Sequence, residues 1–181
     1  MTRVRQIVEE ESARDWLRRH AKKTVFKFSE LSDEAKEVAR NCYRDASYDE
    51  WWDSVYEDAA QAGLRITGFD LQHGRSASGR FIEDAETAAQ KIIADHGDQC
   101  DTYKTASAYL ADRKKLQKLL RRDPDELESQ LDELEAEFLR DLLHDYANSL
   151  QREWDYRNSD ENVDENIEYN EYTFTEEGER T

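Results

Sequence analysis

The chain has 181 residues, of which 37% are hydrophobic and 38% charged, and its formal net charge at pH 7 is −17. This length suits one globular domain with a helical extension better than two independent enzymatic domains. A strongly negative chain is a poor ligand for DNA, RNA or anionic membranes, so the charge favours a partner with a basic surface.

Targeting signals are missing from the sequence as it is written. No apolar run follows the basic residues near the N-terminus, and no window approaches the roughly 18 apolar residues that a membrane span needs. Cys42 and Cys100 are the two cysteines. We therefore expect a cytoplasmic protein with reduced cysteines and no membrane anchor.

The charge is distributed unevenly along the chain. Residues 1–23 carry +3, residues 24–70 carry −6, residues 71–100 carry −2, residues 101–122 carry +5 and residues 123–181 carry −17. The last third thus holds as much net negative charge as the whole chain.

The first hundred residues predict an α+β body. We expect an N-terminal helical segment over residues 1–23, a short strand over 25–28, and then a helix with Ser32 as its N-cap. The spacing of its apolar residues predicts one buried face. This face comprises Leu31, Ala35, Val38, Ala39, Cys42 and Tyr43.

The pattern then predicts a helix over residues 48–62 that ends at Gly63. Residues 64–71 alternate as in a half-buried strand, and a glycine- and serine-rich turn leads to a second strand at 80–82. Helical spacing resumes over residues 83–96. Together these elements predict a small antiparallel sheet flanked by helices.

Two long helices follow, over residues 102–122 and from Pro124 to about Tyr156, with Asp123 as the N-cap of the second. The first helix ends in basic residues and the second begins with acidic residues. We therefore expect an antiparallel helical hairpin over residues 101–158, with charges that pair across the seam. A dimeric coiled coil is the alternative, because so long an apolar stripe can also pair with a second chain.

The last segment alternates polar and bulky residues at Ile167, Tyr169, Tyr172 and Phe174. This alternation predicts a strand that joins the small sheet, and a disordered acidic tail is the alternative. The expected fold class is α+β, with a body formed by residues 24–100 and 163–181 and a long hairpin formed by residues 101–158.

No catalytic or metal-binding pattern is visible. The four histidines have no shared neighbourhood: they are His20, His73, His96 and His144. His96 and Cys100 supply two ligands where zinc needs three or four. His144-Asp145 spells a dipeptide of metal-dependent phosphohydrolases without the further histidines, and residues 74–79 lack the lysine of a P-loop. We expect no cofactor, no metal site and no enzyme.

Three stretches resemble a family of small proteins encoded by tailed phages and prophages. They are FKFSELSDEAKEVARNCYRD at residues 26–45, DEWWDSVYEDAAQAG at residues 49–63, and EYNEYTFTEEGER at residues 168–180. The resemblance covers roughly residues 25–82 and 163–180 and leaves the hairpin as the variable part. It implies a phage accessory protein, and such proteins are often inhibitors of host machinery, including restriction and CRISPR systems.

Charge and resemblance together predict an acidic inhibitor in the host cytoplasm. We expect it to bind a host protein or protein–nucleic-acid complex by presenting carboxylates to a groove that normally holds phosphates, as a DNA mimic does. The candidate contact residues are Glu126, Glu128, Asp132, Glu133, Glu135 and Glu137 in the hairpin, and Asp160, Glu161, Asp164, Glu165, Glu168 and Glu171 in the tail.

Other interpretations remain open at this stage. An acidic helix face is often only a solubilising surface. An antitoxin-like or transcriptional regulator would use the basic stretches, and a small metal-dependent hydrolase would use His96 or His144. A homodimer is compatible with the apolar stripe of the hairpin.

Overall fold

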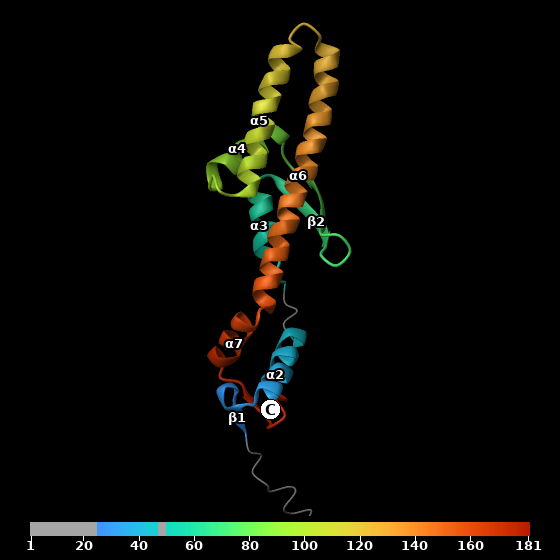
Figure 1. Cartoon of the computed structure of the whole chain (residues 1–181). Coiled ribbons are helices and arrows are strands. Elements are labelled where there is room, and N and C mark those ends of the chain that lie inside the picture. The colour runs from blue at the N-terminus through green and yellow to red at the C-terminus, as the bar shows by residue number, and fades with distance from the viewer. Residues whose placement is uncertain (1–24, 47–49) are drawn as a thin grey trace, which may run out of the picture. The chain divides into compact units, whose positions relative to one another are not determined.

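The computed structural model describes residues 25–46 and 50–181, and the chain divides into two compact units (Figure 1). Of the described residues, 25–46 and 159–181 form the first, here called the terminal unit, and 50–158 form the central unit. The fold class is α+β, as predicted, with helices and two small antiparallel sheets. The helical segment expected over residues 1–23 lies outside the described residues.

The terminal unit joins two segments that are distant in sequence. Its elements are β1 (Phe26–Lys27), η1 (Phe28–Glu30), α2 (Asp33–Ala46), α7 (Asp160–Tyr169) and β4 (Thr173–Phe174). Strand β1 pairs antiparallel with β4, so that Phe26 lies opposite Phe174. The C-terminal segment therefore adds a strand to β1, and the two form a sheet of their own.

The terminal core lies between α2, α7 and β4. Its buried residues are Phe28, Leu31, Ala35, Ala39, Val163, Ile167 and Phe174. Ser32 caps α2 as predicted, because its Oγ accepts a hydrogen bond from the backbone N–H of Ala35 at 3.2 Å. Two residues predicted for this core, Val38 and Cys42, are exposed. Helix α7 covers the Ala35 and Ala39 side of α2 and leaves the neighbouring Val38 in solvent.

The strand predicted over the C-terminal segment is wrong for most of its length. Residues 160–169 form α7, whose N-cap Ser159 accepts a hydrogen bond from the backbone N–H of Asn162 at 3.3 Å. Val163 and Ile167 are four residues apart and both buried, whereas Tyr169 is 86% exposed. The helical period therefore decides the structure here, and the strand is confined to Thr173–Phe174.

The central unit contains a two-stranded hairpin and four helices. Its elements are α3 (Asp53–Gln61), β2 (Leu64–Asp70), β3 (Ser76–Phe81), α4 (Ala85–Asp95), α5 (Asp101–Leu119) and α6 (Pro124–Asn158). Strands β2 and β3 pair antiparallel, with an irregularity between Ile66 and Gly68. Gly63 ends α3 with a φ of +85°, the left-handed conformation in which glycine is favoured.

The base of the α5–α6 hairpin belongs to the core of this unit. Tyr109 of α5 stacks on Phe138 of α6 with 4.2 Å between ring centroids, and Phe138 also stacks on Phe81 of β3. Residues Ala85, Ala89 and Ile92 of α4 complete this buried cluster. The base of the hairpin thus packs on α4 and β3.

The two helices of the hairpin run antiparallel (Figure 1). Asp123 accepts a hydrogen bond from the backbone N–H of Glu126 at 3.3 Å, and Pro124 is the first residue of α6, as predicted. Only one ion pair among the described residues joins the basic half of α5 to the acidic half of α6. It links Arg113 to Glu135 at 3.3 Å. Pairing of charges across the seam is thus much sparser than predicted.

Gly178 allows the C-terminal segment to close against α2. Its φ is +87°, and a Cβ built on it would lie 2.0 Å from the backbone oxygen of Ala35. We expect Gly178→Ala to destabilise the terminal unit by about 2 kcal/mol or more, because both the backbone conformation and the contact become unfavourable. Native-state hydrogen exchange of α2 and α7 measures this loss. Gly68→Ala is the control, since nothing lies within 4 Å of its Cβ position, and equal protection in both variants would contradict the role of Gly178.

Candidate functional site: two acidic surfaces

Most of the predicted carboxylates of α6 face solvent. Four are exposed and form no ion pair within the described residues, namely Glu126, Glu128, Asp132 and Glu133. The other two have partners: Glu135 is half-buried and binds Arg113, and Glu137 binds Arg140 at 3.4 Å.

The basic end of α5 offsets the charge of this surface. Residues 113–137 contain six Lys and Arg and eight Asp and Glu, which leaves a net charge of −2. The two helices lie side by side, so positive and negative side chains are neighbours even where they do not touch. A balanced pair of charged helices has a weak field beyond about one Debye length, roughly 8 Å at physiological salt.

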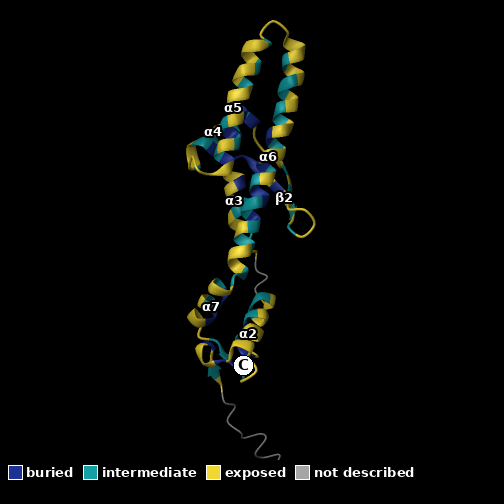
Figure 2. Cartoon of the chain, in the orientation of Figure 1, coloured by how far each residue is buried: buried dark blue, intermediate teal, exposed yellow. Residues whose placement is uncertain are grey.

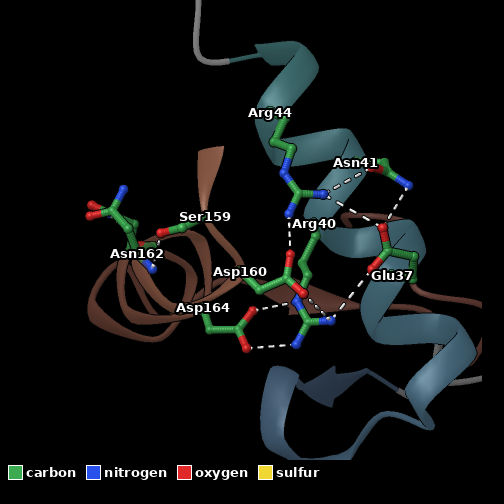
Figure 3. A network of polar contacts seen from close by, with 9 residues as sticks. Glu37, Arg40, Asn41, Arg44, Ser159, Asp160, Asn162 and Asp164 are labelled. Carbon is green, nitrogen blue, oxygen red and sulfur yellow. Dashed lines mark hydrogen bonds and ion pairs between the residues drawn. The ribbon is translucent and has the colours of Figure 1, made fainter. Parts of the chain in front are cut away.

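Two predicted carboxylates in the terminal unit are bound by arginines of α2 (Figure 3). Arg40 donates two parallel hydrogen bonds to Asp164, with Nε to Oδ1 and Nη2 to Oδ2 both at 2.7 Å. Arg44 binds Asp160. The hydrogen bond to Asp164 raises the pKa of Arg40 above its usual value. Asp160 and Asp164 therefore hold α7 against α2 and are not free for a partner.

The remaining carboxylates of α7 form an uncompensated surface, which we call the α7 acidic face. It comprises Glu161, Glu165, Glu168 and Glu171, all exposed and without an ion pair among the described residues. The first three recur at intervals of four and three residues and thus share one side of the helix. Glu171 follows in the turn after α7, with a φ of 53°.

Lys27, which lines a pocket together with Glu168 and Glu171, is a basic neighbour of this face within the described terminal unit. Residues 25–46 and 159–181 hold 14 Asp and Glu against 5 Lys and Arg, a net charge of −9. Arg40 and Arg44 are engaged with Asp160 and Asp164, and the guanidinium of Arg180 stacks over the ring of Tyr172 at 3.6 Å. The four carboxylates of the α7 acidic face are therefore exposed and only partly offset by nearby positive charge.

The central unit also contains a polar pocket of about 620 Å³, formed by α3, α6 and the loop between α4 and α5. In it, the Tyr146 hydroxyl donates to Asp58 at 3.0 Å. His96 lies between Thr102 and Asp58, with Nδ1 2.7 Å from Thr102 Oγ1 and Nε2 3.5 Å from Asp58 Oδ1. Burial raises the pKa of Tyr146, so its hydroxyl remains a donor.

The sequence did not reveal this network, because Asp58, His96, Thr102 and Tyr146 come from distant positions with no motif to link them. This network has a structural role, because it connects helices, both ring nitrogens of His96 are engaged and Thr102 is buried. Cys100 is exposed and takes no part in these bonds.

The residues weighed for metal chemistry are not brought together. Within residues 25–46 and 50–181, no three His, Cys, Asp or Glu side chains are arranged to hold a metal ion. His144 is exposed, while the adjacent Asp145 accepts a hydrogen bond from Thr105 at 2.7 Å. Every helix in the described part of the chain is too short or too polar to span a bilayer.

Comparison of the chain with models of protein families, with curated proteins and with solved structures found no match. The resemblance to small phage proteins is not tested by this result and stays a prediction.

A double-mutant cycle on Arg40 and Asp164 should reveal a favourable coupling of about 1 to 3 kcal/mol, because the bidentate hydrogen bonds are partly shielded from water. Arg40→Met and Asp164→Asn are the single changes, and hydrogen exchange of α2 and α7 gives the free energies. The exposed pair Arg140 and Glu137 of α6, followed by hydrogen exchange of α6, is the matched control and should show weaker coupling. Equal coupling for the two pairs would refute a structural role for Asp164.

Asp145 should make the central unit less stable at neutral pH than at acidic pH. Burial is the main cause that raises the pKa of the Asp145 carboxyl. The folded state therefore binds the proton more tightly than the unfolded state. Stability then falls as the pH rises through the pKa of the folded state. We expect Asp145→Asn to raise the Tm at pH 7, with a gain that shrinks as the pH is lowered.

The control for this prediction is Asp84→Asn. Hydrogen bonds from Thr87 lower the pKa of the Asp84 carboxyl, so its stabilising effect is present at neutral pH and is lost as the pH falls through the folded pKa. Thermal melts across the acidic range measure both variants. A gain for Asp145→Asn that does not change with pH would show that the charge of Asp145 is not its cause.

Proposed function

We propose that the protein is a phage-encoded acidic inhibitor that acts in the host cytoplasm and binds a nucleic-acid-handling defence complex, such as restriction or CRISPR machinery, through its α7 acidic face. The observation that carries this proposal is the row of exposed carboxylates on α7 that form no ion pair with a described residue. Function then depends on binding and not on catalysis.

The row has a charge spacing comparable to that of a nucleic acid strand. A helix rises 1.5 Å per residue, so Glu161, Glu165 and Glu168 present about one charge per 5 Å of helix axis. A DNA strand presents about one charge per 3.4 Å. The Lys and Arg side chains of a groove that binds DNA phosphates would contact carboxylates at similar intervals on α7. Binding to α7 would release counterions, as binding to DNA does.

The acidic half of α6 is a weaker candidate for this contact, although the sequence favoured the two surfaces equally. Basic neighbours on α5 reduce its net charge, whereas Arg40 and Arg44 of α2 are engaged with Asp160 and Asp164 of α7. The surface that binds a basic groove should be the one whose charge is not already offset.

Replacing Glu161, Glu165 and Glu168 by Gln should reduce partner binding by at least about tenfold, which corresponds to 1.4 kcal/mol. The measurement is a pull-down from host lysate with mass spectrometry, at about 0.15 M and about 0.5 M salt, where the Debye length falls to about 4 Å. The wild type should retain a nucleic-acid enzyme or defence complex that high salt or added duplex DNA releases.

The matched control replaces Glu126, Glu128 and Glu133 of α6 by Gln, which removes the same number of charges from the hairpin and should leave retention unchanged. Phage plating on hosts with and without the defence system gives the functional readout. Retention of no nucleic-acid-handling protein by the wild type, or equal loss in both triple variants, would refute the role of the α7 acidic face.

A further inference from the structure

The outer half of the α5–α6 hairpin exposes apolar side chains that the base of the hairpin buries. We call residues 113–134 the distal hairpin. Its leucines Leu116, Leu120, Leu127 and Leu131 are only half-buried, and Leu119 is 79% exposed. Further along α6, Phe138, Leu142, Tyr146 and Leu150 are fully buried. Figure 2 shows the same change along the two helices.

This difference has a simple geometric cause. At the base, α4 and β3 lie against the two helices and close the core. The distal hairpin meets this core only at its lower end, where Arg113 binds Glu86 of α4 at 3.0 Å and Leu134 packs on the buried cluster. Its other half-buried leucines belong to none of the buried clusters of the described residues. Two helices alone leave the flanks of their apolar seam in water, and stable helical bundles cover such seams with further helices.

The exposed flank of the distal hairpin is self-complementary. Lys115 and Leu119 share one face of α5 and Arg122 follows in the turn after this helix, while Glu126, Glu133 and Glu137 share one face of α6. Lys115 binds Asp112 and Glu137 binds Arg140 on their own helices. Arg122, Glu126 and Glu133 form no ion pair with described residues. Each hairpin thus displays a basic stripe and an acidic stripe beside an uncovered leucine.

We propose that the distal hairpin is a homodimer interface, in which a second copy of this chain packs α5 of one copy against α6 of the other. A two-fold axis makes each contact occur twice, so the basic stripe of either copy meets the acidic stripe of its partner. The four helices then enclose the leucines that one hairpin leaves uncovered.

A second copy fits this surface better than an unrelated partner does. A basic groove would be repelled by α5, and an acidic ligand would be repelled by α6, whereas a copy of the same hairpin offers the opposite stripe at each position. The inference stands apart from the proposed function, since it uses neither α7 nor the terminal unit.

Sedimentation of the full chain over about 1 to 100 µM, a range that brackets micromolar affinity, tests the proposal. The wild type should shift from monomer to dimer. Leu119→Gln should weaken dimerisation at least about tenfold without loss of helix content, because an exposed side chain contributes little to the fold. Ile82→Gln, an exposed apolar residue of the same unit, is the control and should dimerise like the wild type.

Charge reversal identifies the pairing of the stripes. The double variant Lys115→Glu with Arg122→Glu has two acidic stripes, and Glu126→Lys with Glu133→Lys has two basic stripes, so each should be monomeric alone. Mixing the two should restore a dimer, because every contact across the interface is again between opposite charges. A chain with all four substitutions keeps both the hairpin and the interface complementary and should dimerise by itself.

A monomeric wild type at the highest concentration would overturn the proposal. A dimer whose affinity is unchanged by Leu119→Gln would also overturn it. The same holds if the mixture of charge-reversed variants stays monomeric while the variant with all four substitutions folds and dimerises. Circular dichroism of each variant separates loss of the interface from loss of the hairpin.

Discussion

Helix α6 carries one apolar stripe along 35 residues, and the central unit is arranged by what covers each part of that stripe. Near its C-terminal end, Trp154 packs on Trp51. In the middle, Tyr146 contacts the α3 and β2 cluster, and Phe138 lies between α5 and β3. Beyond Leu134 toward the hairpin turn, only α5 remains. Burial of the whole stripe requires apolar partners at every turn of such a helix. In the distal hairpin α5 is the single partner of α6 among the described residues, and there we expect an additional subunit.

Electrostatics distinguishes two surfaces that look alike in the sequence. Both α6 and α7 carry a dense set of carboxylates, yet the basic residues that neutralise them lie in different places. The basic residues next to α6 lie on the adjacent helix α5, and they reduce the negative charge that a distant partner of α6 would experience. On α7, Arg40 and Arg44 bind only the inner carboxylates Asp160 and Asp164. These ion pairs fix the helix in an orientation that turns its other carboxylates outward.

Local signals in the sequence predicted local structure well. Ser32, Gly63 and Asp123 were identified as helix boundaries because capping depends on neighbouring backbone groups. Apolar periodicity predicted the long helices and the first strand of the hairpin, but β3 covers Ser76–Phe81 and thus occupies most of the segment predicted as a turn over residues 74–79. The fold class could therefore be predicted without knowledge of tertiary contacts.

Errors occurred where a distant segment decides the outcome. Ile167 fits both an alternating and a helical pattern, and burial against α2 selects the helix. Val38 was predicted to be buried because the pattern does not say which side of α2 would be covered. The bond between Arg40 and Asp164 spans 124 residues, so no spacing rule reveals which acids of α7 are engaged.

The terminal unit is built from segments on either side of the central unit, and this order constrains how the protein emerges from the ribosome. Helix α2 is synthesised early, but its apolar face is covered by α7 and β4, which follow more than a hundred residues later. The central unit is complete at residue 158 and can fold before α7 and β4 have been synthesised. Folding of the terminal unit is thus coupled to synthesis of residues 159–181, and a translation product that stops before them would carry a folded hairpin but lack the α7 acidic face.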